Sequence, residues 1–229
     1  MTGRIRKVGI VLTAVGLMFV AATAFAAFKT YEGYRALNTL SAAQAVTLTY
    51  NDQGQLTDRG KTDEAQAIMS LLTNDWGYPV NSADLNPNDP TVNTASEYMY
   101  QMATITYHTL HSTVAVTLAE PVDYKGKHYA AGEYQVPIAG KYFSQMDRLD
   151  PLEGPARNIA WSGTAHALIA ELGVGTATAT ALQLGLGIAG LFAGLALIAF
   201  IAGLGIVWAT QPERETNRKA SLQPQVIPV

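Results

Sequence analysis

The stretch VGIVLTAVGLMFVAATAFAAF, residues Val8–Phe28, decides the fold, together with LGLGIAGLFAGLALIAFIAGLGIVWA at Leu184–Ala209. Neither run contains a charged residue. With a rise of about 1.5 Å per residue, the two runs as helices would be about 32 Å and about 39 Å long. The hydrocarbon core of a bilayer is about 30 Å thick. The sequence therefore predicts a membrane protein in which two terminal transmembrane α-helices, 8–28 and 182–209, flank a small α+β extracytoplasmic domain.

The charges on either side of the runs predict an orientation. Of 15 basic and 18 acidic residues, three basic ones precede the first run, and three basic and two acidic ones follow residue 181, which leaves a net charge of −7 between the spans. Because positively charged flanks stay in the cytoplasm, we expect a plasma-membrane protein with both termini cytoplasmic. The basic segment 1–7 and a disordered tail 210–229 would then lie inside, and the domain 29–181, including the membrane-proximal part of the last helix, outside.

Composition also narrows the partners. An acidic domain argues against nucleic acid, because phosphate binding needs clustered Lys and Arg. The expected partners are the lipid bilayer and other membrane protein subunits, or a second copy of the chain. There is no cysteine, which excludes disulfides, thiolate metal sites and iron–sulfur clusters, and no cofactor is expected.

The first run has a second interpretation. Residues 24–26 read Ala-Phe-Ala, which matches the small-residue cleavage pattern of a secretory signal. The run of 21 apolar residues is longer than the core of a typical signal, about 7–15 residues. We therefore favour an uncleaved anchor.

Local patterns predict the elements of the middle. The mix of polar and apolar residues in 29–40 is compatible with a continuation of the first helix. Three more helices are expected where apolar residues recur every three or four positions: one capped by Thr62 that ends near Asn74, one from the Thr94–Glu97 capping box to about 111, and a last one through 165–172 that runs into the second span. Strands are expected where β-branched and aromatic residues cluster: Ala45–Tyr50, Thr113–Leu118, a hairpin of 122–124 and 128–129 around 125–127, and 134–138. Residues 81–92 read as a loop, and Asp150-Pro151 and Gly154-Pro155 as breaks that end the unit.

One helical face contains possible metal ligands. The predicted helix places Glu97, Gln101, Thr104, His108 and His111 on a single polar stripe, because residues about three turns apart share a face. Two histidines and a carboxylate are ligand types that suit Zn²⁺ or another divalent ion. A solvated face opposite an apolar one gives the same pattern. The candidate metal ligands are therefore His108, His111 and Glu97, and no catalytic residue is assigned.

Two further groups have both a chemical and a structural interpretation. Ser162 and His166 would pair as nucleophile and base, or form the polar face of a helix. Three acids near Arg148 and Arg157 would act as paired carboxylates, or form an ion-paired surface loop: Asp147, Asp150 and Glu153.

Small residues in the spans indicate close helix packing. Where lipid provides no hydrophobic drive, helices associate through glycine and alanine spaced four residues apart. The candidate packing residues are Gly187, Gly190, Gly194, Ala199 and Gly203 in the second span, and Ala22 and Ala26 in the first. Their partner would be the other span, a second copy or a different subunit.

The sequence resembles a poorly characterised group of actinobacterial two-span membrane proteins with an extracytoplasmic domain. The resemblance rests on the N-terminal span, on YFSQMDRLDP at residues 142–151 followed by a helix, and on the closing Gly/Ala/Leu span. Some members carry an aromatic-ring-opening dioxygenase label, which would imply an iron site of histidine and carboxylate. The resemblance carries over no functional residue.

Three functions follow from these patterns. The first is a non-enzymatic accessory, scaffold or assembly subunit of an envelope or membrane complex. The second is an extracytoplasmic module that binds a small ligand or lipid in a pocket lined by some of its tyrosines and Trp161. The third is a metal-dependent enzyme. A deep apolar cavity would favour the second function over the first.

Overall fold

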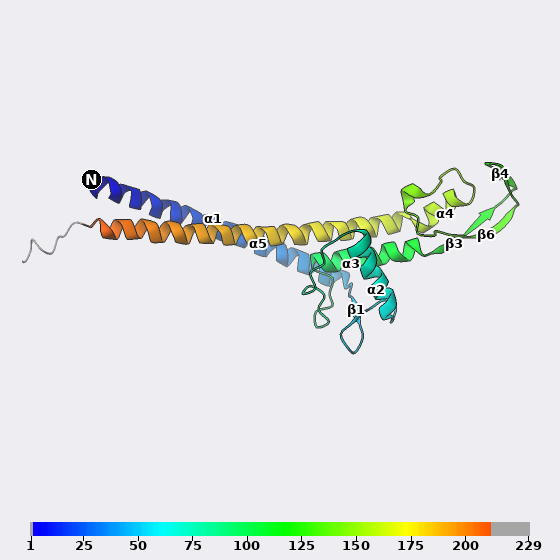
Figure 1. Ribbon diagram of the computed structural model, residues 1–229, viewed down its shortest axis with the longest axis horizontal. Coiled ribbons are helices and arrows are strands. Elements are labelled where there is room, and N and C mark those ends of the chain that lie inside the picture. The colour runs from blue at the N-terminus through cyan, green and yellow to red at the C-terminus, as the bar shows by residue number, and fades with distance from the viewer. Residues whose placement is uncertain (1, 212–229) are drawn as a thin grey trace, which may run out of the picture. The chain divides into compact units, whose positions relative to one another are not determined.

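The computed structural model describes residues 2–211 (Figure 1). Two long apolar helices, α1 (Thr2–Gln44) and α5 (Gly163–Ala209), flank a small α+β region in the chain order. The chain divides into two compact units, one of residues 1–32 with 183–229 and one of Gly33–Leu182. Each long helix contributes one part to either unit. The tail expected at 210–229 lies outside the described residues from 212 onward.

In the first unit the two helices are long and apolar enough to cross a membrane, by length and composition. Only 11% of the most apolar window of each helix is buried, so most of this apolar surface has no protein neighbour. The helix α1 begins at Thr2, before the first predicted span residue, and extends past the predicted end at 40 to Gln44. The expected continuity of α5 through Gly173 and Gly175 is confirmed.

The two helices of this unit meet in an antiparallel seam that repeats every seven residues. Seven of the shielded positions of α1 are spaced alternately three and four residues apart, with Thr13, Val15 and Ala22 shielded beside them: Gly9, Leu12, Gly16, Phe19, Thr23, Ala26 and Thr30. Seven shielded positions of α5 follow the same spacing, with Phe200 and Val207 shielded beside them: Gly185, Ala189, Phe192, Ala196, Ala199, Gly203 and Ile206. Such spacing is typical of left-handed helix pairs, and the small residues let the two backbones come close. The rings of Phe19 and Phe192 stack with centroids 5.9 Å apart.

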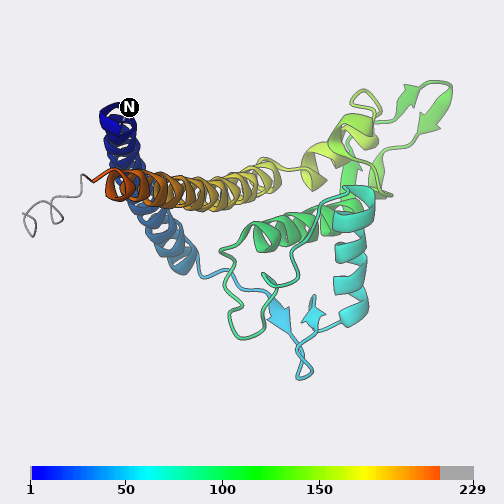
Figure 2. The ribbon, with the colours of Figure 1, turned by 60° about the vertical axis from the view of Figure 1, so that its left-hand side comes forward.

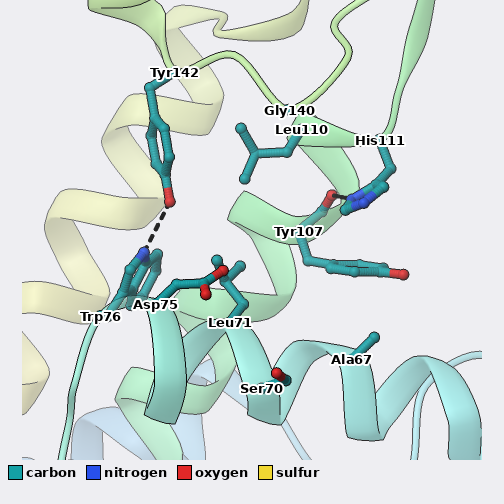
Figure 3. Close-up of a pocket in the computed structure, with 10 residues that line it drawn as sticks. All are labelled: Ala67, Ser70, Leu71, Asp75, Trp76, Tyr107, Leu110, His111, Gly140 and Tyr142. Atoms are coloured by element: carbon teal, nitrogen blue, oxygen red, sulfur yellow. Dashed lines mark hydrogen bonds between the residues drawn. The ribbon is translucent and has the colours of Figure 1, made fainter.

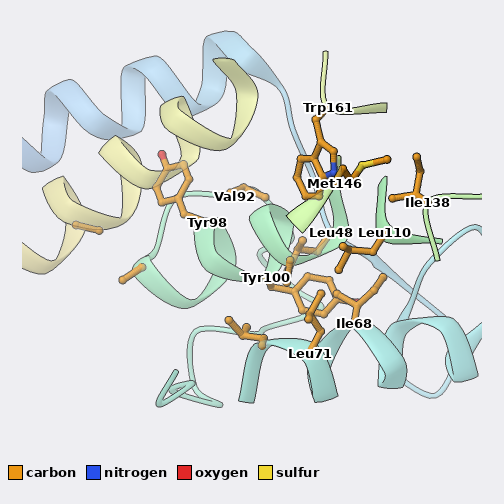
Figure 4. Close-up of a cluster of buried hydrophobic side chains, with 14 of the residues drawn as sticks. Leu48, Ile68, Leu71, Val92, Tyr98, Tyr100, Leu110, Ile138, Met146 and Trp161 are labelled. Carbon is orange, nitrogen blue, oxygen red and sulfur yellow. The ribbon is translucent and has the colours of Figure 1, made fainter. Parts of the chain in front are cut away.

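The second unit is built around α3 (Ala95–Leu110). One side of α3 packs against α2 (Thr62–Ser70), whose Ile68 is fully buried. Figure 2 shows α2 (cyan) crossing α3 (green) steeply, and Figure 4 shows Tyr100, Ile68 and Leu71 gathered between them. The opposite side of α3 meets the long helices, since the Tyr98 hydroxyl lies 2.7 Å from the Ser41 hydroxyl of α1. The α3 helix is therefore the centre of the core.

Short strand pairs complete the unit. The strand β1 (Thr49–Tyr50) pairs with β2 (Leu56–Thr57), β3 (Thr113–Leu118) with β6 (Gly132–Pro137), and β4 (Val122–Tyr124) with β5 (Lys127–Tyr129), all antiparallel. Between β4 and β5, Lys125 (φ 48°) and Gly126 (φ 77°) both have positive φ, the backbone of a type I′ turn. The predicted hairpin around 125–127 and the strand at 113–118 are confirmed.

Other local predictions need correction. Only Thr49–Tyr50 of the strand expected at Ala45–Tyr50 is strand, because α1 continues to Gln44 and Ala45 turns the chain with φ 52°. Thr62 does not cap α2: Lys61 holds the N-cap position and makes no side-chain capping hydrogen bond to the backbone. The helix then widens into a π turn, η1 (Leu71–Asp75), and stops one residue beyond the predicted Asn74.

The break expected at Asp150-Pro151 is found as a turn, whereas the one expected at Gly154-Pro155 lies inside a helix. A short 3₁₀ turn, η2 (Phe143–Gln145), leads to α4 (Glu153–Ala160). Gly154 and Pro155 thus lie in the first turn of a helix, where proline is tolerated because the N–H that it lacks has no intrahelical partner. A Cβ on Gly154 would lie 2.5 Å from the carbonyl oxygen of Arg148, so the tight loop before α4 requires glycine there.

Candidate binding sites

The structure gives each predicted metal ligand a different partner. Nε2 of His108 lies 2.8 Å from Oδ2 of Asp58. Nδ1 of His111 donates to the carbonyl oxygen of Tyr107, 2.8 Å away. Glu97 is 1% exposed, and its carboxylate accepts hydrogen bonds from the residues just before α3. Within residues 2–211, no group of three or more histidines and acids is placed to hold a metal ion.

Glu97 closes the capping box that the sequence predicts. Its Oε2 accepts hydrogen bonds from the backbone N–H of Asn93 (3.0 Å) and Thr94 (2.9 Å) and from the Thr94 hydroxyl (2.8 Å). In return, the Thr94 hydroxyl accepts from the Glu97 N–H. Burial raises the pKa of the Glu97 carboxyl, and these bonds lower it in part. The stripe thus begins with a buried structural carboxylate, not a solvated one.

The three acids of the 142–153 segment hold its loop together. Asp147 binds Lys125 at the hairpin turn (2.7 Å) and the Tyr124 hydroxyl (3.0 Å), and this network lowers the pKa of Asp147 to about 2. Asp150 accepts the N–H groups at the start of α4, and Glu153 pairs with Lys141. The cations that pair with Asp147 and Glu153 are therefore lysines, whereas the sequence suggested Arg148 and Arg157.

Ser162 and His166 belong to a helix start. The Ser162 hydroxyl accepts from the N–H of Ala165 (3.2 Å), and the His166 ring Nδ1 donates to the Ser162 carbonyl oxygen (3.1 Å). The His166 ring packs edge-on against Phe143 at 5.1 Å. Ser162 thus caps the helix and His166 makes an aromatic contact. The Ser162 hydroxyl and the His166 ring are not paired as nucleophile and base.

The candidate packing residues divide between two faces of the first unit. A Cβ on Gly203 would lie 2.5 Å from Oγ1 of Thr13, and Ala199 and Ala26 are shielded in the same seam. Ala22 is half-buried beside it. In contrast, a Cβ on Gly187, Gly190 or Gly194 would meet nothing within 4 Å. These three glycines do not serve the contact between α1 and α5.

An apolar groove lies between three helices of the second unit. Its volume is about 900 Å³, and its lining comes from α1, α3, α5 and the residue Val46. Leu37, Tyr98 and Gly175 form its buried floor. At its mouth, Leu40 is 54%, Leu168 42% and Val174 66% exposed. Most of the surface offered to an occupant is therefore aliphatic.

Polar groups of the groove are few. The Gln44 amide of α1 donates to the Glu171 carboxylate of α5, which joins the two helices beside the groove. The Tyr98 hydroxyl is already engaged by Ser41. Gln101 and Thr178 supply the remaining polar side chains. This arrangement suits an apolar chain and offers little to a highly polar ligand.

A second pocket, of about 670 Å³, lies where the π turn meets the end of α3. Figure 3 shows three aromatic side chains around it, Trp76, Tyr107 and Tyr142, with the Asp75 carboxylate among them. The indole N–H of Trp76 donates to the Tyr142 hydroxyl at 2.9 Å. We name this the aromatic pocket.

The sequence did not predict where the apolar groove and the aromatic pocket lie. One interpretation of the sequence had tyrosines and Trp161 line a pocket, but Trp161, Tyr100 and Tyr129 are buried. Tyr98 lines the groove and Tyr107 the aromatic pocket. The available signal was local: Asp75-Trp76-Gly77 places an acid and an indole at a helix end. No family, curated protein or solved structure matches this chain, so its function must be inferred from its own residues.

Proposed function

We propose that the chain is a two-span membrane protein whose α+β domain binds a lipid-like ligand with a straight apolar chain. The observation that carries this proposal is the apolar groove between α1, α3 and α5. The proposal is of a binding module, not of an enzyme.

The exposed surface of the long helices supports the membrane part of the proposal. Large apolar side chains such as Met18, Phe25 and Ile198 are exposed along both. Removal of apolar surface from water is favourable by about 25 cal/mol per Å². Contact with lipid would therefore stabilise these exposed side chains. Soluble proteins rarely expose contiguous apolar patches beyond a few hundred Å². We place both spans in the plasma membrane, with both termini cytoplasmic and the domain outside.

The size and lining of the groove support the ligand. Binding pockets for small molecules typically measure about 300–1,000 Å³ and are lined mainly by apolar side chains, and the groove lies within that range. Leu40, Leu168 and Val174 would lose exposed surface to an occupant. The groove is also close in sequence to the spans, since Gly33 follows Phe28 by five residues on the same helix. A ligand drawn from the bilayer therefore fits the site.

Filling the groove tests this proposal. Ala36→Trp places an indole in the lining, whereas Ala42→Trp, also at an exposed position of α1, lies outside it. The full chain, held in amphipol to avoid competing detergent, is titrated with cis-parinaric acid, a fluorescent straight-chain probe. We expect saturable binding to the wild type, a loss of at least tenfold in affinity for A36W, and no change for A42W. Equal binding by both variants, or no saturation by the wild type, would refute the proposal.

A scaffold or assembly subunit is the second candidate. The observation in its favour is the open face of α5 at Gly187, Gly190 and Gly194, which α1 leaves uncovered in the first unit. Because the chain has no cysteine, Gly190→Cys introduces a single reactive thiol on this face. Oxidative crosslinking in native membranes should give a dimer or a defined mixed product, whereas Ala189→Cys, a buried position, should give none. A lone monomer from both variants would count against this candidate.

A further inference from the structure

We propose that the aromatic pocket binds a small organic cation, such as the ammonium group of an amine or of a lipid headgroup. This site is separate from the apolar groove, with which it shares no lining residue. The proposal rests on three observations: aromatic walls, a carboxylate without an ion-pair partner, and a strained backbone that frames both.

The aromatic walls are held in place by their own contacts. Tyr142 receives the hydrogen bond from the Trp76 indole and stacks on Trp161 with ring centroids 5.8 Å apart. On the other side of the pocket, the Tyr107 ring lies 4.2 Å from that of His111. Trp76, Tyr107 and Tyr142 are each half-buried. Aromatic faces attract cations within about 6 Å of the ring centre through the ring quadrupole.

The charge of the lining is one-sided. Asp75 is its only acid, and none of the ten lining residues is lysine or arginine. Each ion pair found among residues 2–211 uses another carboxylate, so Asp75 has no cationic partner there. In Figure 3 its carboxylate lies between the Trp76–Tyr142 pair and Tyr107. A bound cation would thus meet a full negative charge and the faces of aromatic rings together.

Two irregular backbone segments position the side chains of the aromatic pocket. The Trp76 N–H donates to the carbonyl oxygen of Leu71, five residues back, at 3.0 Å. This π turn changes the direction in which Asp75 and Trp76 project, and such turns occur often at functional sites. Across the pocket, Ala139 has φ 51° and is followed by Gly140, a lining residue, with φ 76°. A non-glycine residue at positive φ stores strain that is often found beside binding sites.

The chemistry favours a cation over an anion or a sugar. An anion would be repelled by Asp75 and would find no lysine or arginine in the lining. A sugar would need several hydrogen-bonding groups, but the Trp76 N–H and the His111 Nδ1–H are already donated within the protein. The net charge of −7 between the predicted spans also attracts cations.

Isothermal titration of the full chain in a non-ionic maltoside tests the proposal. The probes are choline and 3,3-dimethylbutanol, which has the shape of choline without its charge. We expect saturable choline binding and at least tenfold weaker binding of the alcohol. Equal affinity for the two would overturn the proposal without the need for any variant, as would the absence of saturable choline binding.

Variants locate the site. Asp75→Asn keeps the shape of the side chain and removes its charge, and we expect it to weaken choline binding at least tenfold. Asp52→Asn makes the same change at an exposed turn outside the lining and should leave binding unchanged. Equal losses in the two variants, or none in D75N, would overturn the assignment. If phosphocholine binds at least as tightly as choline, the cation comes from a headgroup; if it binds more weakly, from a free amine.

Discussion

Glu97 is the residue whose surroundings most constrain its role. A single carboxylate oxygen accepts two backbone N–H groups and one hydroxyl at the start of the central helix. Buried donors that lose their acceptor each carry a penalty of about 1–3 kcal/mol. The residue therefore contributes to stability through its acceptor oxygen rather than through any ion pair.

Replacement of Glu97 should show this directly. We expect Glu97→Ala to lower the free energy of unfolding of the domain by at least about 1–3 kcal/mol, the cost of one donor left without an acceptor, measured by denaturant titration of the full chain in detergent. Glu97→Gln retains an acceptor oxygen and should lose less. An alanine variant as stable as the wild type would contradict the capping role.

The stability difference between the wild type and E97Q should change with pH in a definite direction. Because burial raises the pKa of Glu97, the folded state favours the protonated form more than the unfolded state does. The resulting stabilisation is present below the ordinary pKa of the group and is lost as pH rises through the raised value. Melting temperatures measured from pH 4 to 7 should therefore shift in favour of E97Q as pH rises. A difference between E97Q and wild type that does not change over this range would exclude the effect.

At this scale the sequence supported two incompatible roles for one residue. The capping box Thr94–Glu97 was predicted from spacing alone, because capping is local. The metal stripe needed the same carboxylate free and solvated, which depended on how α3 packs. Its neighbours bury that end of the helix, and Asp58, 50 residues away from His108, provides the partner that local spacing could not reveal.

Among the elements, the seam between α1 and α5 makes the most specific demand on side-chain size. A Cβ on Gly203 would lie 2.6 Å from the backbone nitrogen of Thr13 and 2.8 Å from the carbonyl oxygen of Gly9, whereas one on Gly190 would lie in open space. Overpacking of a close contact typically costs about 1–3 kcal/mol. The two glycines are thus a matched pair in one helix.

We expect Gly203→Leu, and not Gly190→Leu, to separate the two helices. In a Phe19→Cys, Phe192→Cys background, whose parent rings stack at 5.9 Å, disulfide formation reports their contact, since the chain has no other cysteine. The yield should fall at least severalfold with G203L and stay the same with G190L. Equal yields in both would show that the seam tolerates a large residue.

The hairpin of β4 and β5 should respond to acid. Asp147 holds the turn through Lys125, and its pKa is lowered to about 2. The stabilisation is therefore complete above the ordinary pKa of an aspartate and is lost as pH falls through that lowered value. Exchange protection of the β4 and β5 amides should decrease between about pH 4 and 2, relative to α3. Asp147→Asn should remove this pH step; a step that persists would assign it to another group.

Helices, strands and turns were predicted correctly where the signal lies in a short stretch of sequence. Predictions failed where several residues fit the same pattern and only tertiary packing distinguishes them. The turn Lys125-Gly126 and the strand Thr113–Leu118 are encoded by short signals. The heptad seam is present in the sequence, but nearly every residue of α5 beyond 184 is small or apolar, so no face stands out. Gly190 and Gly194 match the spacing rule as well as Ala199 and Gly203 do, and only the structure separates them. Nothing in the sequence Leu71–Asp75 indicates a π turn.

In the whole molecule, the groove is assembled from segments of α1, α3 and α5 that lie more than fifty residues apart. The stripe that contains Leu168 and Leu172 was predicted, whereas the contributions of α1 and α3 were not. A stripe that fills a core and one that lines a cavity have the same periodicity. Membrane anchoring would suit such a groove, because a domain that takes its ligand from the bilayer must stay close to the bilayer.

The orientation of the molecule is therefore the property on which a lipid-binding role depends. A cysteine-free chain allows single thiols to report it: Asp52→Cys in the domain and Gly3→Cys before the first apolar run, both at exposed positions. In intact cells, a membrane-impermeant maleimide should label D52C and should label G3C only after permeabilisation, because basic flanks stay in the cytoplasm. The reverse pattern would place the domain inside. A mature chain that begins at Ala27 would remove the first span, and a single helix would then have to anchor the groove.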